Sequence, residues 1–313
     1  MEIVIDGLAF HDSPEIREPH GLDFVDDDLL AVANRNGVIQ LLRLPPLGTT
    51  GEVTSAGSVV CELGAPGSVA VMDGYVLAVH SWANALTRYR VTDDSISGGE
   101  VLAHRWLDLP DGIATSESGR WLAISNHNSH DVLVFETETL HPDADPVAIL
   151  RGMAYPHGLR FMSGDRFVVV ADAGAPYVDV FARTGDSWSS AAYPSMSLRV
   201  MDDETFVRGH HTPREGGPKG LDIDPRSGVL LVTAEEAPLA FFDLDLALEA
   251  GTTRPGSELV QNELERMRDL ERSRAETSAM REQLGAVLNT KAWRATAPAR
   301  GALTALKRLR ELP

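Results

Sequence analysis

The sequence contains a single cysteine, Cys61, so it cannot form an intrachain disulfide. This pattern is typical of reducing compartments, whereas small secreted domains are usually rich in disulfides. No stretch of about 18 or more apolar residues occurs, which argues against a membrane-spanning helix. Residues 2–6 (EIVID) are strand-like and follow Met1 without the basic region and apolar core of a signal peptide. We therefore expect a cytoplasmic protein.

Positive charge is scarce in the first 253 residues, which hold 16 Lys and Arg against 38 Asp and Glu, a balance of −22. From Arg254 onward the balance reverses to +4, and the whole chain carries −18. Lys219 is the only lysine before Lys291. Because binding to a phosphate backbone needs a basic surface, the acidic body argues against nucleic acid as the main partner.

Several catalytic signatures are also missing. The chain has no glycine-rich phosphate loop, no His-Glu-x-x-His, no paired-cysteine motif and no Gly-x-Ser-x-Gly nucleophile elbow. It therefore offers no recognised catalytic constellation.

The chain does contain an internal repeat, which starts each time with a triplet of proline, a variable residue and glycine. After the triplet come a short apolar strand, a turn, a longer apolar strand and an alternating strand, with no helical periodicity before about residue 245. The prolines are 47, 44, 46 and 62 residues apart. The triplets are Pro19-His20-Gly21, the variant Pro66-Gly67-Ser68, Pro110-Asp111-Gly112, Pro156-His157-Gly158 and Pro218-Lys219-Gly220.

Units of about 45 residues with four short strands predict an all-β propeller, in which each blade buries its faces against its neighbours. Five blades are favoured, and an insertion at residues 202–217 in the long fourth interval leaves six open. The fifth unit has no obvious fourth strand, while residues 2–10 (EIVIDGLAF) precede the first unit without a partner. We predict that this N-terminal strand closes the last blade of a propeller spanning residues 1–248.

The units at residues 110–136 and 156–183 resemble blades of the gluconolactonase and senescence-marker-protein superfamily and of related YVTN-type propellers. The resemblance covers about residues 1–245 and implies a divalent metal at the axis, usually in a hydrolase of lactones or esters. In that family the variable residue is often Asn or Asp, and a Glu of the first blade also binds the metal. Here the corresponding positions are His20, Gly67 or Ser68, Asp111, His157 and Lys219, which differ from the all-oxygen set that calcium prefers.

The variable residues of the triplets are expected to face one another, because the innermost strands of a propeller converge on its central channel. His20, Asp111, His157 and Lys219 are therefore the candidates for an axial ligand-binding site. The two imidazoles and the carboxylate could hold a divalent metal such as zinc, iron or manganese. The same residues could instead form a hydrogen-bonded polar plug, or bind a small anionic or sugar ligand with the help of the lysine.

The ends of the second strands supply a further ring of candidates. Asn, His and Trp side chains there could bind and stack on a sugar or nucleotide, although Asn and Asp also simply fit tight turns. His210 and His211, in the insertion, could cap the channel or lie in a solvent-exposed loop. The candidates at the strand ends are Asn34, His80, Trp82, Asn126, Asn128, Asp172 and Glu235, with their neighbours Arg35, Asn36, His127 and Glu236.

Composition changes to helix-forming residues after the last unit, and we predict a linker at residues 249–258 and a helix at residues 259–290. Its apolar positions have near-heptad spacing, weakened in the middle by Arg274 and Thr277, which predicts a short coiled coil able to form a homo-oligomer. The heptad positions are Val260, Leu264, Met267, Leu270, Met280, Leu284 and Leu288.

Residues 291–313 form a basic amphipathic tail that could lie on an anionic membrane or on a partner protein, or pack against the propeller or a second copy. Residues 288–309 resemble the tail that follows a coiled coil in many bacterial glycosyltransferases and methyltransferases of surface-polysaccharide assembly. The resemblance implies recruitment to membrane-proximal glycan assembly. The matching residues are Trp293, Arg294, Thr296, Pro298 and Arg300.

These features together predict a cytoplasmic propeller with an α-helical coiled-coil tail, held at the inner face of the membrane if the tail meets lipid. We interpret it as a binding or scaffold protein of bacterial surface-glycan biosynthesis, recruited by its tail to the membrane or to a glycosyltransferase. The alternative is a metal-dependent hydrolase of the lactonase or esterase type with an axial site.

Overall fold

The computed structural model describes residues 16–46, 51–93, 95–188, 193–210, 214–224, 226–254 and 256–289. The chain divides into two compact units, residues 1–266 and residues 267–313. The first unit contains five antiparallel sheets, and the second begins inside a long helix.

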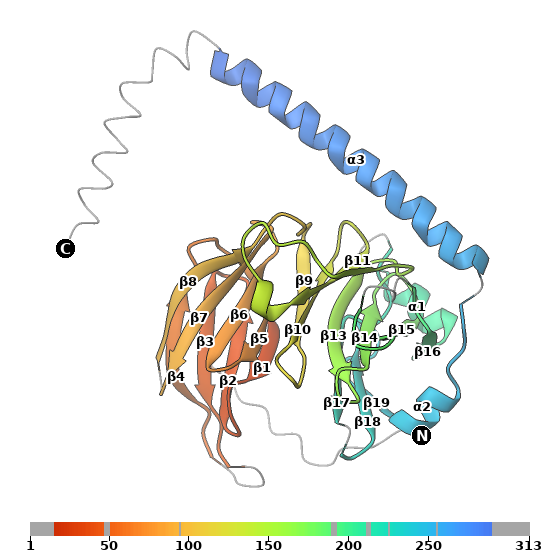
Figure 1. Ribbon diagram of the computed structural model, residues 1–313, viewed down its shortest axis with the longest axis horizontal. Coiled ribbons are helices and arrows are strands. Elements are labelled where there is room, and N and C mark those ends of the chain that lie inside the picture. The colour runs from red at the N-terminus through yellow and green to blue at the C-terminus, as the bar shows by residue number, and fades with distance from the viewer. Residues whose placement is uncertain are drawn as a thin grey trace, which may run out of the picture. The chain divides into compact units, whose positions relative to one another are not determined.

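The five sheets are the blades of a β-propeller, which confirms the predicted fold and the count of five blades (Figure 1). In each blade the chain passes from the innermost strand to the outer ones in sequence order. The blades are β1 (Pro19–Phe24), β2 (Leu29–Asn34), β3 (Val38–Arg43) and β4 (Thr54–Val60); β5 (Pro66–Met72), β6 (Tyr75–His80), β7 (Ala85–Thr92) and β8 (Ser95–Ala103); β9 (Pro110–Thr115), β10 (Trp121–Asn126), β11 (Asp131–Glu136) and β12 (Ala148–Leu150); β13 (Pro156–Met162), β14 (Phe167–Asp172), β15 (Tyr177–Ala182) and β16 (Met196–Arg199); and β17 (Gly220–Asp224), β18 (Val229–Thr233) and β19 (Ala240–Asp243).

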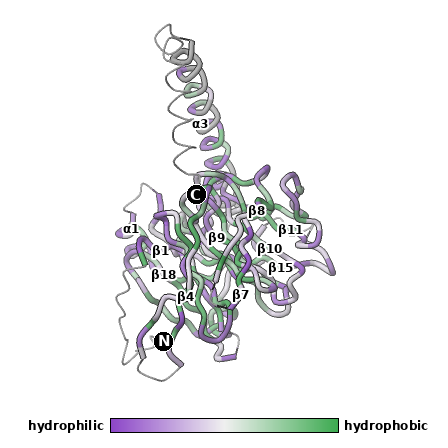
Figure 2. Tube along the Cα trace, turned by 90° about the vertical axis from the view of Figure 1, so that its left-hand side faces the viewer, coloured by the Kyte–Doolittle hydropathy of each residue, from purple (hydrophilic) through white to green (hydrophobic). Residues whose placement is uncertain are grey.

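The second strands are the most apolar because both of their faces lie against other blades, and strands buried on both faces carry near-continuous hydrophobic runs. In β10 every residue is buried, and β14 is buried from Val168 to Asp172. Hydrophobic residues gather along the strands, and the connections between them are largely hydrophilic (Figure 2).

The triplets mark the start of the innermost strands in the first four blades. Their prolines pair with the last residue of the second strand, and a bulge follows each proline. The glycine allows the next blade to approach closely: a Cβ on Gly112 would lie 2.1 Å from the carbonyl oxygen of His157, and one on Gly158 would lie 2.9 Å from that of Lys219. Proline and glycine therefore serve the backbone, which leaves the middle residue free to vary.

Buried apolar clusters join blade one to two, two to three, three to four and four to five. Among the described residues no such cluster joins blade five to blade one. Leu22 and Phe24 of β1 each remain 51% exposed, and a hollow on blade five is lined by Leu231, Phe241 and neighbouring residues. The N-terminal strand predicted to close this blade, residues 2–10, lies outside the described residues.

The described residues of the insertion at residues 202–217 add no sixth sheet to the five blades. The insertion contains the short helix α1 (Asp203–Arg208), whose first turn is capped by Asp202, with its carboxylate accepting from the Thr205 amide at 2.7 Å. The fourth strand of blade four, β16, had no clear signal in the sequence, and a further short helix, α2 (Leu244–Glu249), follows β19.

The segment after α2 is fastened to blade four rather than free. Thr252 pairs with Ser197 of β16, and the buried guanidinium of Arg254 lies 2.8 Å from Asp172 and 2.7 Å from Asp179. Asn262 also donates to the carbonyl oxygen of Gly152 at 3.0 Å. The two compact units divide within a helix, after residue 266, and the linker at residues 249–258 stays a prediction.

Helix α3 spans Gly256–Asn289. A helix is therefore present where the sequence predicts one, but the structure does not show the predicted coiled coil. The tail residues Trp293, Arg294, Thr296, Pro298 and Arg300 lie outside the described residues. None of the described helices has the length and apolar character that a membrane span requires.

Candidate axial site

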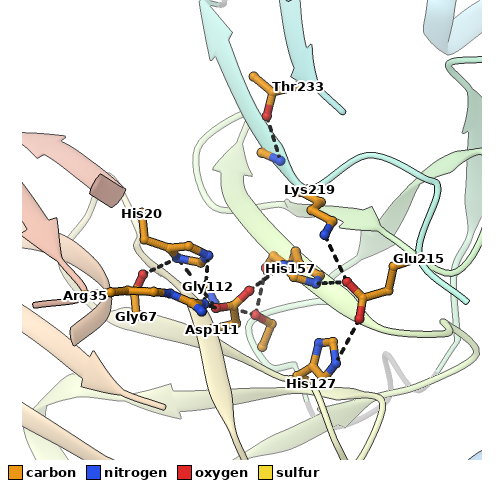
Figure 3. Close-up of polar contacts among 12 residues, drawn as sticks. His20, Arg35, Gly67, Asp111, Gly112, His127, His157, Glu215, Lys219 and Thr233 are labelled. Carbon is orange, nitrogen blue, oxygen red and sulfur yellow. Dashed lines mark hydrogen bonds and ion pairs between the residues drawn. The ribbon is translucent and has the colours of Figure 1, made fainter. Parts of the chain in front are cut away.

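The four predicted axial residues come together at one end of the inner strands. His20, Asp111 and His157 stand at the starts of β1, β9 and β13, and Lys219 directly precedes β17. They form a continuous row of polar contacts that Glu215 completes (Figure 3). The backbone beneath them is tied together, because the Ser125 hydroxyl accepts from the Gly112 amide and donates to the His157 carbonyl, each at 2.7 Å.

Asp111 is the buried centre of this row. His157 Nδ1 contacts one carboxylate oxygen, while His20 Nδ1 and Arg35 Nη2 lie 3.6 Å and 3.3 Å from the other. Burial alone would raise the pKa of Asp111, but attraction and hydrogen bonding from His157, with further attraction from Arg35, hold it well below its usual range. Asp111 is therefore an ionised carboxylate near neutral pH.

His20 is a neutral imidazole. Its Nδ1 donates to the carbonyl oxygen of Gly67 at 2.5 Å, and its Nε2 accepts from Arg35 at 2.9 Å. Burial lowers the pKa of His20, and the positive charge of Arg35 lowers it further against the attraction of Asp111. The ring therefore links Asp111 to the backbone of blade two.

His157 joins Asp111 to a second carboxylate, Glu215. Its Nε2 lies 3.5 Å from Glu215 Oε2, while His127 Nε2 lies 3.3 Å from Oε1 and Lys219 Nζ lies 3.1 Å from Oε2. Burial opposes the charged form of His157, but Asp111 and Glu215 outweigh it and raise its pKa to about 9. Burial likewise opposes ionisation of Glu215, yet its contacts with His127 and His157 hold its pKa far below the usual value.

Glu215 is the residue that sequence reasoning missed. It belongs to the insertion, which has no repeat register from which its direction could be inferred. The available signal was its place four residues before Lys219, in the loop that leads into an axial triplet. His127 was named only as a neighbour of a strand-end candidate; it follows β10, and its ring contacts that of Tyr155 with centroids 5.0 Å apart.

The strand-end candidates have a different, repeated role. In four blades the last side chain of the second strand hydrogen-bonds the backbone two residues before the triplet proline, which is the turn role that Asn and Asp commonly take. The pairs are Asn34 with Arg17, His80 with Gly64, Asn126 with Asp108 and Asp172 with Ala154, at 3.0–3.1 Å.

The remaining candidates lie apart from the axial row. Trp82 is 75% exposed, and Asn128 donates to the Asp108 carboxylate at 3.2 Å. Glu235 lies exposed beyond the end of β18. His210 packs against Phe206 in the insertion, and His211 lies outside the described residues.

The predicted metal ligands His20, Asp111 and His157 lie in contact, with the two imidazoles on different oxygens of the Asp111 carboxylate. Among the described residues, a different trio has ligand atoms within 4.8 Å of one another: His127, His157 and Glu215. Two imidazoles and one carboxylate suit zinc and related metals better than calcium.

The five sheets and their inner ring define a five-bladed β-propeller. Solved structures share this fold. One is a chain of the nidogen/laminin complex, with 16% identity, a TM-score of 0.53 and coverage of 77% of this chain and 81% of that one. Another is a putative 6-phosphogluconolactonase from Bacteroides uniformis, with 14% identity, a TM-score of 0.52 and coverage of 72% of this chain and 66% of that one.

At these identities the similarity shows the fold alone. No protein-family model matches the sequence, and the search of curated proteins gives no match.

Proposed function

We propose that this protein is a binding or scaffold propeller of bacterial surface-glycan biosynthesis, whose axial residues take a small anionic ligand such as a sugar acid or sugar phosphate. The observation that carries the proposal is the convergence of charged side chains from several blades at one end of the inner strands (Figure 3). The propeller fold positions these side chains, and the exposed positive charges among them indicate an anionic ligand.

The cationic groups are the ones that solvent reaches. The side chains of Lys219 and Arg35 are 38% and 39% exposed, whereas those of Asp111 and Glu215 are 7% and 14% exposed. Because the pKa of His157 is about 9, the cations Arg35, His157 and Lys219 outnumber the carboxylates Asp111 and Glu215 by one at neutral pH. An approaching solute therefore meets positive charge, which favours carboxylate or phosphate groups.

The place in glycan assembly is supported by the sequence of the tail. The Trp-Arg-x-Thr-x-Pro-x-Arg pattern at residues 293–300 and the basic charge of residues 291–313 favour recruitment to the membrane surface or to a glycosyltransferase. The near-heptad positions of residues 259–290 favour a homo-oligomer.

The ligand proposal can be tested by calorimetric titration of chelator-treated protein with gluconate and glucose 6-phosphate, and with neutral glucose for comparison. We expect an anion to bind, glucose not to bind, and Lys219→Met to weaken the anion at least about tenfold, as loss of one charge-assisted contact would. Arg226→Met, which removes a 95% exposed cation from blade five, is the matched control. Equal binding of the anions and glucose would refute the proposal.

A second candidate is a metal-dependent hydrolase of lactones or esters. It is favoured by the trio His127, His157 and Glu215, and one neighbour in fold is described as a putative 6-phosphogluconolactonase. A divalent metal there would polarise a carbonyl and activate water. Lactone hydrolysis that requires both added metal and His157 would favour this function over binding alone.

A further inference from the structure

We infer that His127, His157 and Glu215 form a binding site for a divalent transition metal of the zinc type, and that Asp111 is the positioning residue for His157. This site does not require the anionic ligand proposed above, although it includes His157 and Glu215 of the same axial row. It differs from the metal set expected from the triplets, because two of its three ligands lie outside them.

The first support is the spacing of the donor atoms. Two ligands bound at about 2.0–2.1 Å to a tetrahedral metal lie roughly 3.3 Å apart. His127 Nε2 lies 3.3 Å from Glu215 Oε1, and His157 Nε2 lies 3.5 Å from Glu215 Oε2. The rings of the two histidines stand nearly perpendicular, with centroids 5.2 Å apart. The two histidines approach different oxygens of the carboxylate, and the ligand atoms of all three residues lie within 4.8 Å of one another, so the side chains already face a common point.

The second support is the state of His157. The residue is 7% exposed, and its buried Nε2 lies 3.5 Å from Glu215 Oε2, at the outer limit of a hydrogen bond, and makes no hydrogen bond of normal geometry with the described residues. A buried polar atom without a hydrogen bond is costly, which calls for a ligand. This nitrogen points toward Glu215, in the direction from which His127 also approaches (Figure 3).

The third support is the contact on the other side of the same ring. His157 Nδ1 contacts Asp111, and metal-binding histidines typically donate their second ring N–H to a carboxylate, which fixes the tautomer and the ring orientation. Asp111 is held in turn by Arg35 and His20. Asp111 is thus the hydrogen-bond partner that would orient His157 as a metal ligand.

The donor set indicates the class of metal. Two imidazoles and one carboxylate are typical of zinc, iron, cobalt and manganese sites, whereas calcium and magnesium prefer oxygen ligands. Three protein ligands also leave a coordination position open, as in catalytic rather than structural zinc sites. Lys219 contacts Glu215 at 3.1 Å, and its charge would oppose a metal, so its removal should strengthen metal binding.

The test uses the full-length protein after treatment with a chelator. Zinc, manganese and calcium are titrated separately by calorimetry, and bound metal is counted by elemental analysis after dialysis. We expect one zinc per chain, no calcium at comparable concentration, and losses of affinity of at least about 100-fold for His157→Ala, His127→Ala and Glu215→Gln. His141→Ala, which removes an exposed histidine of blade three, should leave zinc binding unchanged.

The role of Asp111 needs a separate readout. Asp111→Asn should weaken zinc roughly 10- to 100-fold, as loss of a partner outside the ligand shell does, and should change the visible spectrum of bound cobalt. Lys219→Met should bind zinc more tightly while losing the anionic ligand, so the two proposals fail separately. If a variant at a buried position does not fold, the zinc affinity of His127→Ala tests the site, because His127 is only partly buried.

The proposal would be overturned if the wild-type protein bound no zinc in the titration. It would also be overturned if His127→Ala and Glu215→Gln bound zinc as tightly as the wild-type protein.

Discussion

Asp111 shows how a single residue acquires its state from its surroundings. Burial disfavours its charge, yet the positive charges of His157 and Arg35 keep the carboxylate ionised, while His20 contacts it as a neutral ring. The sequence allowed these partners to be expected, because His20 and His157 occupy the same triplet position in other blades. It could not show that the two imidazoles bind opposite oxygens, since side-chain direction within a channel depends on blade geometry.

Asp131 is a second buried carboxylate, but unlike Asp111 it is not contacted, within the described part of the chain, by cationic side chains as close as Arg35 and His157. It therefore provides a test of how protein stability depends on pH. Asn126 Nδ2 and Ser129 Oγ donate to it at 3.0 Å and 2.8 Å, but burial dominates and raises its pKa to about 6. The folded state therefore holds this proton more tightly than the unfolded state. As the pH rises from about 4 to about 6, Asp131 therefore lowers the free energy of unfolding. Above about pH 6 this destabilisation has reached its full size and no longer changes with pH.

We predict that Asp131→Asn stabilises the protein at pH 8 by about 1–3 kcal/mol, because the amide keeps an acceptor oxygen without the buried charge. The gain should shrink below about pH 5, where the wild-type carboxyl is protonated. Denaturant unfolding of both proteins at pH 4.5 and pH 8 measures this difference. Asp27→Asn, at an exposed position in the turn after β1, is the control. A gain of the same size at both pH values would contradict the explanation.

At the scale of elements, most strands could be predicted because each blade repeats one alternation of apolar segments and turns. The triplets located the innermost strands, and their prolines pair with the expected strand ends. The fourth strand of blade four and the helix α1 were not predicted, because the insertion and its neighbourhood share no period with the other units. Glu215 was missed for the same reason, so the axial residues were identified but their second carboxylate was not.

Blade five is the element whose completion can be tested. Its described strands end at β19, and the apolar side chains of Leu22, Phe24 and Phe241 are not joined in a buried cluster. We predict that deletion of residues 2–10 lowers the melting temperature by about 5–15 °C. Loss of a few buried apolar side chains lowers the free energy of unfolding by several kcal/mol. A change of about 1 kcal/mol shifts the melting temperature of a protein of this size by about 2–4 °C.

Thermal unfolding followed by circular dichroism measures the effect of this deletion. Adding a peptide of residues 1–12 should restore part of the loss, and Val4→Pro, which removes a backbone donor from the segment, should mimic the deletion. An unchanged melting temperature for both altered proteins would show that this segment does not close the blade.

At the scale of the whole molecule, two regions of opposite charge share one chain. The first 253 residues carry a balance of −22 and the remainder +4, and the segment between them is fastened to blade four by Arg254. Composition marked the change from strands to helix correctly. It could not show how the segment is held, because a buried arginine between two carboxylates has no signature in a one-dimensional pattern.

The basic end of the chain provides the last prediction. Residues 287–313 hold six Lys and Arg against one acidic residue, Glu311, together with Trp293 and several leucines. Near an anionic membrane each basic residue contributes about 1 kcal/mol, and buried apolar side chains add to this. We therefore expect the full-length protein to float with vesicles containing about 30% phosphatidylglycerol, and a chain lacking residues 287–313 to remain in solution.

Binding should weaken when salt is raised from 0.1 M to 0.5 M, because the Debye length shortens. Vesicles of neutral phosphatidylcholine are the control, and they should retain little protein. Cell fractionation of the same two chains checks the result where partner proteins are present. If the deletion leaves both vesicle binding and cellular distribution unchanged, the tail does not recruit the propeller.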